Sequence, residues 1–126
     1  TSGAIEGLVR EFGGEMRVGA GTVLTSDQAL AARDAGAQYI ISPNTNPEVI
    51  RTTKKLGLTS IPGASTPSEI VSANESGADF VKLFPAGYYG LGYFKDKKAP
   101  LSHIKLIATA GINDTNIAQF FELGAV

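Results

Sequence analysis

The chain has 126 residues, 43% of them hydrophobic and 18% charged, with a formal net charge of −1. This length allows one domain with a real core, and scattered basic residues with no net positive charge argue against a nucleic-acid partner. No run of about 18 apolar residues occurs, so we expect no membrane span. Zero cysteines exclude disulfides and thiolate metal sites, and one histidine argues against a histidine metal site. No export leader is visible, so we expect a cytoplasmic protein.

Helical and strand patterns alternate along the chain. Helix starts are marked by a Thr or Ser at 25–26, by Asn46 before Pro47, and by Thr66 with Glu69 three residues later, a capping-box spacing. The predicted helices cover 3–12, 26–36, 46–57, 66–77 and 113–124. The predicted strands cover 16–20, 38–42, 58–61, 80–84 and 104–108, with loops over 21–25, 62–66 and 109–112.

One lysine, Lys82, lies within the apolar run 80–84, which Pro85 ends. Such a run predicts a buried strand, where an unpaired lysine is rare. Desolvation lowers the pKa of a lysine, and a neutral amine on a rigid strand is the nucleophile that forms a Schiff base with a ketone. The alternative is a lysine at the end of a strand, whose stem packs inside while its ammonium reaches solvent.

The stretch 87–98 is rich in glycine and tyrosine, and the sequence leaves its role open. Its tyrosines could form a lid, a subunit interface or a packing surface against a neighbouring helix. We expect the charged residues 95–98 to form a solvated turn, although a patch that steers phosphate is an alternative. We expect His103 to be a loop residue on the far face.

The alternation of strands and helices predicts an α/β fold with a parallel sheet. Small polar and turn residues follow every predicted strand, which is typical of the carboxyl-terminal face of a TIM (β/α)8 barrel. An open doubly wound sheet would need a G-x-G-x-x-G fingerprint, and none follows a strand. We therefore expect residues 1–126 to form a single, partial barrel domain of about five βα units, truncated at both ends.

Six segments resemble, in order and spacing, the 2-keto-3-deoxy-6-phosphogluconate (KDPG) aldolases, also known as 4-hydroxy-2-oxoglutarate (KHG) aldolases. They are 19–25 (GAGTVLT), 41–43 (ISP), 61–63 (IPG), 66–70 (TPSEI), 81–86 (VKLFPA) and 109–112 (TAGI). The resemblance implies a homotrimeric TIM barrel with no metal and no cofactor. It also implies a class I aldolase that cleaves a small 2-keto acid to pyruvate and an aldehyde, either glyceraldehyde 3-phosphate or glyoxylate.

The resemblance also implies roles for individual residues. Lys82 matches the Schiff-base lysine, and Phe84 packs beside it. Thr22 and Pro43 match positions that line the pyruvate pocket, although Thr22 on its own also fits an ordinary loop residue. Two carboxylates, Glu48 and Glu69, lie at helix starts, where the helix dipole explains them better than a catalytic role does.

Thr109, Ala110 and Gly111 match the turn that contacts the far end of the substrate and its phosphate, although a plain strand-to-helix turn uses the same residues. The family usually has glycine at the position of Ala110. Alanine still offers its N–H to an anion but resists positive φ, which predicts weaker phosphate binding or a preference for the unphosphorylated substrate.

The family's general acid/base glutamate and carboxylate-binding arginine precede the first helix of this chain. A second hypothesis is therefore a catalytically incomplete fragment that associates with other chains to cover its sheet edges. A third is a different phosphate-binding barrel in which Lys82 is dispensable.

Overall fold

The computed structural model describes residues 2–126, in which helices alternate with short parallel strands. The helices are α1 (Ser2–Phe12), α2 (Ser26–Asp34), α3 (Pro47–Lys55), α4 (Pro67–Glu75), α5 (Ala86–Lys98) and α6 (Ile117–Glu122). The strands are β1 (Gly19–Ala20), β2 (Tyr39–Ile41), β3 (Thr59–Ile61), β4 (Gly63–Ala64), β5 (Val81–Leu83) and β6 (Leu106–Ala108). The five predicted helices and five predicted strands are present, but the strands and the last helix, predicted over 113–124, are shorter than expected. Across residues 2–126 no helix has the length and apolar character needed to cross a membrane.

Local capping signals set the helix starts. The Thr25 and Asn46 side chains accept backbone N–H groups at the starts of α2 and α3. At the start of α4 the predicted capping box is confirmed, because Thr66 and Glu69 each bind the other's backbone N–H. These bonds satisfy N–H groups that have no partner within the helix.

The strands pair in the order β1-β2-β3 and β4-β5-β6, and β3 and β4 are consecutive parts of one segment. Pro62 separates them because it has no N–H to donate, but its carbonyl accepts the Lys82 N–H at 2.8 Å. The predicted loop over 62–66 is therefore wrong at its start, since Gly63 and Ala64 pair with β5. The two sheets together provide five neighbouring strand positions.

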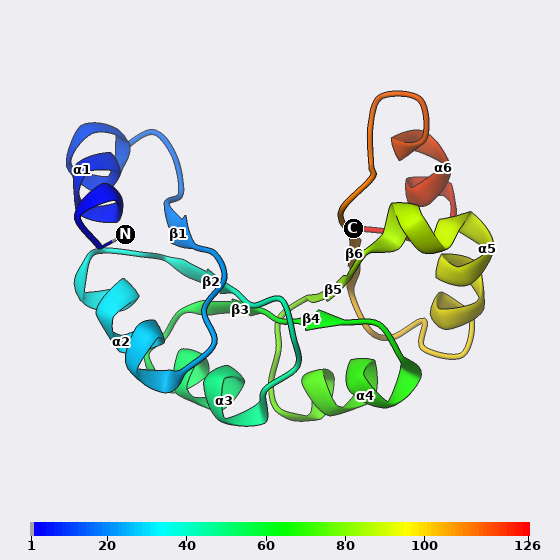
Figure 1. The fold of residues 1–126 in the computed structure, drawn as a ribbon, viewed down its shortest axis with the longest axis horizontal. Coiled ribbons are helices and arrows are strands. Elements are labelled where there is room, and N and C mark those ends of the chain that lie inside the picture. Colours follow the sequence, from blue (N-terminus) through cyan, green and yellow to red (C-terminus); the bar gives the residue numbers. More distant parts are fainter. Residues whose placement is uncertain (1) are drawn as a thin grey trace.

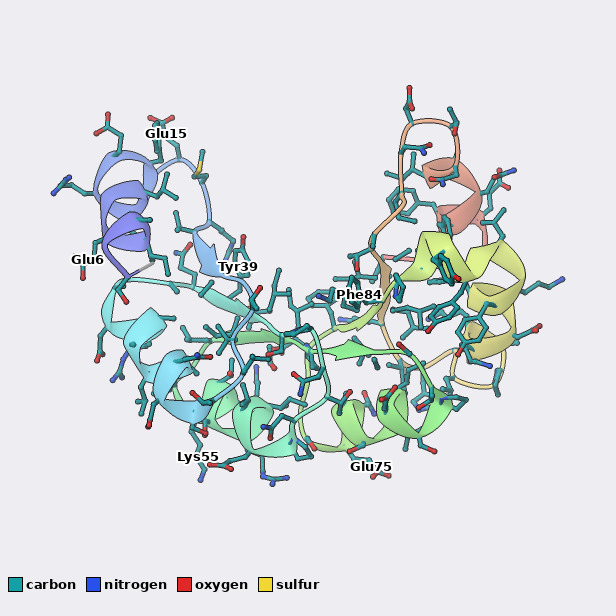
Figure 2. All side chains as sticks on the ribbon, viewed as in Figure 1. Glu6, Glu15, Tyr39, Lys55, Glu75 and Phe84 are labelled. Carbon is teal, nitrogen blue, oxygen red and sulfur yellow. The ribbon has the colours of Figure 1, made fainter. Side chains whose placement is uncertain are left out.

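The strands line the inner side of an arc and the helices cover its outer side (Figure 1). Ile40, Val81 and Leu106 are at most 1% exposed and belong to the two cores that include residues of the helices. Alternate strand residues face the inner side, where Figure 2 shows Tyr39 and Phe84. This arrangement is that of a partial (β/α)8 barrel, in which parallel strands lie inside a layer of helices.

Helix α5 contains the glycine- and tyrosine-rich stretch that the sequence left open. Gly90, with φ of 85° and ψ of 174°, kinks it, and only glycine adopts such angles easily. The predicted turn over 95–98 is wrong, because these residues form the last turn of α5. The helix is held by Phe94, which is fully buried and packs edge-to-face on Phe120 at a centroid distance of 5.5 Å.

Candidate active site

Lys82 occupies the centre of β5, between Gly63 of β4 and Ile107 of β6. Its neighbours Val81 and Leu83 are at most 1% exposed, whereas Lys82 is half-buried and faces the inner side of the arc. No carboxylate of residues 2–126 forms an ion pair with it. Burial lowers the pKa of the Lys82 amine below its ordinary value, so more of the amine is neutral and nucleophilic at a given pH.

Phe84 provides an apolar wall beside this amine. The Lys82 Nζ lies 4.8 Å from the centroid of the Phe84 ring, and the ring points to the inner side of the arc (Figure 2). The Phe84 N–H donates to the Ala64 carbonyl at 3.1 Å, and the Phe84 carbonyl accepts the Ser65 hydroxyl at 2.6 Å. The peptide bond to Pro85 is cis. Both backbone polar groups of Phe84 are therefore held by the last residue of β4 and the residue that follows it.

The turn after β6 packs against the beginning of α5. The Ala86 N–H donates to the Thr109 carbonyl at 2.8 Å. The Gly87 N–H donates to the Ala110 carbonyl at the same distance. A Cβ at Gly87 would lie 2.5 Å from the Gly111 carbonyl oxygen, so this close approach requires glycine. Thr109 also pairs with β5, since its N–H donates to the Leu83 carbonyl at 3.3 Å. The turn therefore lies beside the end of the lysine strand.

The conformation of this turn leaves donors available. Ala110 and Gly111 have φ of 66° and 75°, and their N–H groups have no acceptor within residues 2–126. The Thr109 hydroxyl oxygen is the one buried side-chain polar atom of that range without a hydrogen-bond partner. Ala110 thus adopts a positive φ, although alanine was expected to resist it. Successive free N–H groups in such a turn can bind an anion, and a buried hydroxyl gains most from a polar partner.

Thr22 follows β1 and Pro43 follows β2. A Cβ at Gly63 would lie 2.3 Å from the Pro43 carbonyl oxygen, so Pro43 contacts the residue that pairs with Lys82. Thr22 is exposed, with φ of 58°, and lines a cavity of about 420 Å³ between α1, β1 and α2 that Lys82 does not reach. The structure thus brings Lys82 together with Phe84 and the turn after β6. It places Pro43 next to this group and Thr22 in a separate cavity.

A family model described as KDPG and KHG aldolase matches residues 1–126. The chain belongs to the KDPG and KHG aldolases. Among curated relatives, the 2-dehydro-3-deoxy-6-phosphogalactonate aldolase of Escherichia coli (strain K12) is 38% identical over 122 residues. The 2-dehydro-3-deoxy-phosphogluconate aldolase of Treponema pallidum (strain Nichols) is 37% identical over 113 residues.

Solved structures agree with the family assignment. One described as the native KDPGal structure has a TM-score of 0.92 and 38% identity, covering 97% of this chain and 60% of that one. A KDPG aldolase from Legionella pneumophila, solved with pyruvate captured at low pH as a covalent carbinolamine intermediate, has a TM-score of 0.84 and 31% identity. That match covers 96% of this chain and 57% of the Legionella protein.

This KDPG and KHG aldolase chain spans only part of the length of its relatives. It covers 60% of the Escherichia coli enzyme and 54% of the Treponema pallidum enzyme, although 96% and 89% of the chain itself is matched. The predicted family and the predicted barrel are confirmed, and the described strands correspond to part of that barrel.

The two carboxylates considered in the sequence have structural partners. Glu69 Oε2 accepts the N–H groups of Ser65 and Thr66, each at 2.8 Å, and these bonds lower the pKa of the Glu69 carboxyl. Glu48 follows the cap of α3 and accepts the Ser26 hydroxyl at 3.3 Å. Their helix-start interpretation agrees with these contacts. Over residues 2–126 no three His, Cys, Asp or Glu side chains gather closely enough to hold a metal ion.

The sequence did not single out Ser65, whose hydroxyl binds the Phe84 carbonyl. Ser65 lies in a loop between a strand and a capped helix. No local sequence pattern could indicate its bond to Phe84, because the two residues are 19 apart in the chain.

Proposed function

We propose that this KDPG and KHG aldolase chain carries the nucleophile of a class I aldolase, and that Lys82 forms a Schiff base with a 2-keto acid. The observation that carries the proposal is the Lys82 amine at the centre of β5, which is half-buried and has no carboxylate partner among residues 2–126. Burial lowers the pKa of this amine. The covalent pyruvate carbinolamine in the Legionella pneumophila relative supports the same chemistry. A surface lysine would have neither the burial nor the fixed backbone.

The reaction follows from the chemistry of an amine and a ketone. The Lys82 Nζ attacks the C2 carbonyl of the substrate, and loss of water from the carbinolamine leaves an iminium. The iminium accepts the electron pair of the C3–C4 bond as the C4 hydroxyl gives up its proton to a water molecule. The aldehyde leaves, and Lys82 holds an enamine of pyruvate. Protonation at C3 and hydrolysis then release pyruvate and regenerate the amine.

We assign the remaining site residues to substrate binding. Pro43 and Phe84 line the pocket for the pyruvate half, whereas Thr22, which the sequence also predicted there, lines a separate cavity and is not assigned to it. Thr109 contacts the far half of the substrate. The free N–H groups of Ala110 and Gly111 bind its phosphate. The free amides and the position of this turn beside β5 support this assignment.

The substrate is a 2-keto-3-deoxy-6-phospho sugar acid or 4-hydroxy-2-oxoglutarate, and the products are pyruvate and either glyceraldehyde 3-phosphate or glyoxylate. The names of the relatives support the phosphorylated class. In this proposal residues 1–126 belong to one barrel domain, and the active assembly is a homotrimer. A structure 38% identical to the chain was built by fusing symmetric oligomeric domains, which supports an oligomer.

A cleavage assay tests this function. The protein is incubated separately with KDPG, its galactonate epimer and 4-hydroxy-2-oxoglutarate, and released pyruvate is measured. We expect pyruvate from at least one substrate and none from Lys82→Ala. Pyruvate release by Lys82→Ala would contradict the proposal. If the protein forms a covalent pyruvate adduct but cleaves no substrate, the chain is a catalytically incomplete fragment, as the second hypothesis states.

A further inference from the structure

The end of the lysine strand is held by a side chain where the sheet would be expected to use its backbone. In the ladder between β4 and β5, the Phe84 N–H donates to the Ala64 carbonyl at 3.1 Å. The regular parallel pattern would then direct the Thr66 N–H to the Phe84 carbonyl. Instead, the Ser65 hydroxyl donates to that carbonyl at 2.6 Å.

The helix cap explains this replacement. Glu69 Oε2 accepts the Thr66 N–H at 2.8 Å, so the capping box of α4 takes the donor that would have continued the ladder. The same oxygen accepts the Ser65 N–H at 2.8 Å and the Thr66 hydroxyl at 3.0 Å. Within residues 2–126 the Ser65 hydroxyl is therefore the only donor to the Phe84 carbonyl.

Tyr93 fixes the third polar group of Ser65. Its phenol donates to the Ser65 carbonyl at 2.6 Å. The Tyr93 ring stacks on the Tyr89 ring at a centroid distance of 4.6 Å. The Lys97 Nζ lies 4.3 Å from the centroid of the Tyr93 ring. Hydroxyl, N–H and carbonyl of Ser65 thus each have a partner, on Phe84, Glu69 and Tyr93 respectively. A half-buried residue with every polar group bound has little freedom to move.

We propose that Ser65, anchored by Tyr93, is a positioning residue that holds Phe84 against the Lys82 amine and so keeps that amine in its reactive place. Phe84 is the link, because its carbonyl carries the Ser65 bond and its ring lies 4.8 Å from the Lys82 Nζ. The expected effect on the rate of reaction with a 2-keto acid rests on the proposed function. The expected effect on the solvent exposure and pKa of the Lys82 amine does not. Loss of the bond frees the strand end, lets water reach the amine and misplaces it for attack.

The first experiment measures the Lys82 environment without any substrate. The full chain is labelled with a trace of acetic anhydride across a pH series, and acetylation of Lys82 is read by mass spectrometry. The exposed Lys55 serves as the internal standard for reagent. We expect the midpoint of Lys82 labelling to move to higher pH in Ser65→Ala and Tyr93→Phe.

Two matched variants provide the controls. Ser65→Thr keeps the hydroxyl and should keep the wild-type midpoint. Tyr89→Phe removes a phenol from the same aromatic stack, but this phenol makes no hydrogen bond within residues 2–126, so it should also leave the midpoint unchanged. Circular dichroism checks that each variant is folded. If Ser65→Ala does not fold, the labelling midpoints of Tyr93→Phe and Tyr89→Phe are compared, and a higher midpoint in Tyr93→Phe alone supports the proposal.

The second experiment measures the rate of borohydride-trapped adduct formation with pyruvate. We expect about a tenfold slower rate in Ser65→Ala and Tyr93→Phe, within the range that small misplacement of a reacting group produces. Unchanged labelling midpoints in both variants would overturn the proposal. If wild-type protein forms no pyruvate adduct while Lys82 labelling still depends on Ser65, the proposed function fails and the positioning role stands.

Discussion

Asp79, just before strand β5, and Lys82, at its centre, differ in how their charges are paired. Before the strand, Asp79 binds the Lys54 Nζ through both carboxylate oxygens, at 2.7 and 2.8 Å, and accepts the Ser60 N–H at 2.8 Å. Within the strand, Lys82 has an aromatic ring beside it and no carboxylate partner among residues 2–126. In barrels of this type the amino-terminal face serves stability and the carboxyl-terminal face serves function, and the ion pair of Asp79 lies on the amino-terminal side of Lys82, in keeping with that division.

Backbone and hydroxyl groups show the same contrast. Near the carboxyl ends of the strands, the Thr109 hydroxyl is buried without a partner and Ala110 has a φ of 66°. An unpaired buried polar group costs about 1–3 kcal/mol, and a left-handed alanine about 1–2 kcal/mol. No other buried side-chain polar atom of residues 2–126 lacks a partner. The unfavourable terms therefore collect where the substrate is proposed to bind.

The largest expected effect is on Lys82. Lys82→Met removes the amine but keeps an unbranched apolar side chain, so we expect complete loss of adduct formation with pyruvate. Because an unpaired, half-buried amine adds nothing to stability, thermal unfolding should occur at the wild-type temperature or above it. A persistent adduct on another lysine, or a clear loss of stability, would contradict the contrast between Asp79 and Lys82.

Asp79→Ala should show the opposite behaviour. It removes bonds to Lys54 and to the Ser60 N–H, and with partial exposure of the pair we expect a loss of about 1–2 kcal/mol in the free energy of unfolding. Denaturant titration measures this loss, and adduct formation at Lys82 should be retained. Lys54→Met, which leaves the Ser60 bond intact, is the control and should lose about 0.5–1 kcal/mol. Equal losses in the two variants would contradict the role of the Ser60 bond.

The Asp79 contribution should depend on pH. Burial raises the pKa of the Asp79 carboxyl, but the hydrogen bonds from Lys54 and the Ser60 N–H outweigh it and leave the pKa below its ordinary value. A carboxyl with a lowered folded-state pKa stabilises fully above its unfolded value of about 4 and loses that effect as pH falls through the folded value. The stability gap between wild type and Asp79→Asn should therefore shrink below about pH 4. A gap that stays constant as the solution is acidified would refute this interpretation.

The smallest expected effect is at the turn after β6. Ala110→Gly removes the left-handed penalty of about 1–2 kcal/mol, while the greater unfolded-state freedom of glycine takes back about 0.5–1 kcal/mol. We expect a net gain of roughly 0.5–1 kcal/mol in unfolding free energy. Gly111→Ala is the matched control and should be destabilised, because Gly111 has a φ of 75°. If Ala110→Gly loses stability, the positive φ at Ala110 is not a strain in this protein.

Most of the fold followed from local signals in the sequence. The caps at Asn46 and Thr66 predicted helix starts that the structure confirms, and the apolar run around Lys82 predicted β5. These predictions held because capping and burial periodicity depend on residues close together in the chain.

What the sequence did not predict depends on tertiary contacts. Helix α5 is rich in glycine, a poor helix former, and owes its place to the burial of Phe94 against Phe120. The positive φ at Thr22 and Ala110 opposes the local preference of both residue types. The bond from Ser65 to Phe84 arises only because the capping box has already taken the Thr66 N–H.

The central claim is that Lys82 is a Schiff-base nucleophile. The most direct test incubates the protein with pyruvate, reduces it with borohydride, and reads the intact mass and the modified peptide. We expect a mass increase of about 72 Da, the reduced pyruvate adduct of one amine, on the peptide that contains Lys82. Folded protein that gains no mass, or that gains it on a different lysine, would contradict the claim.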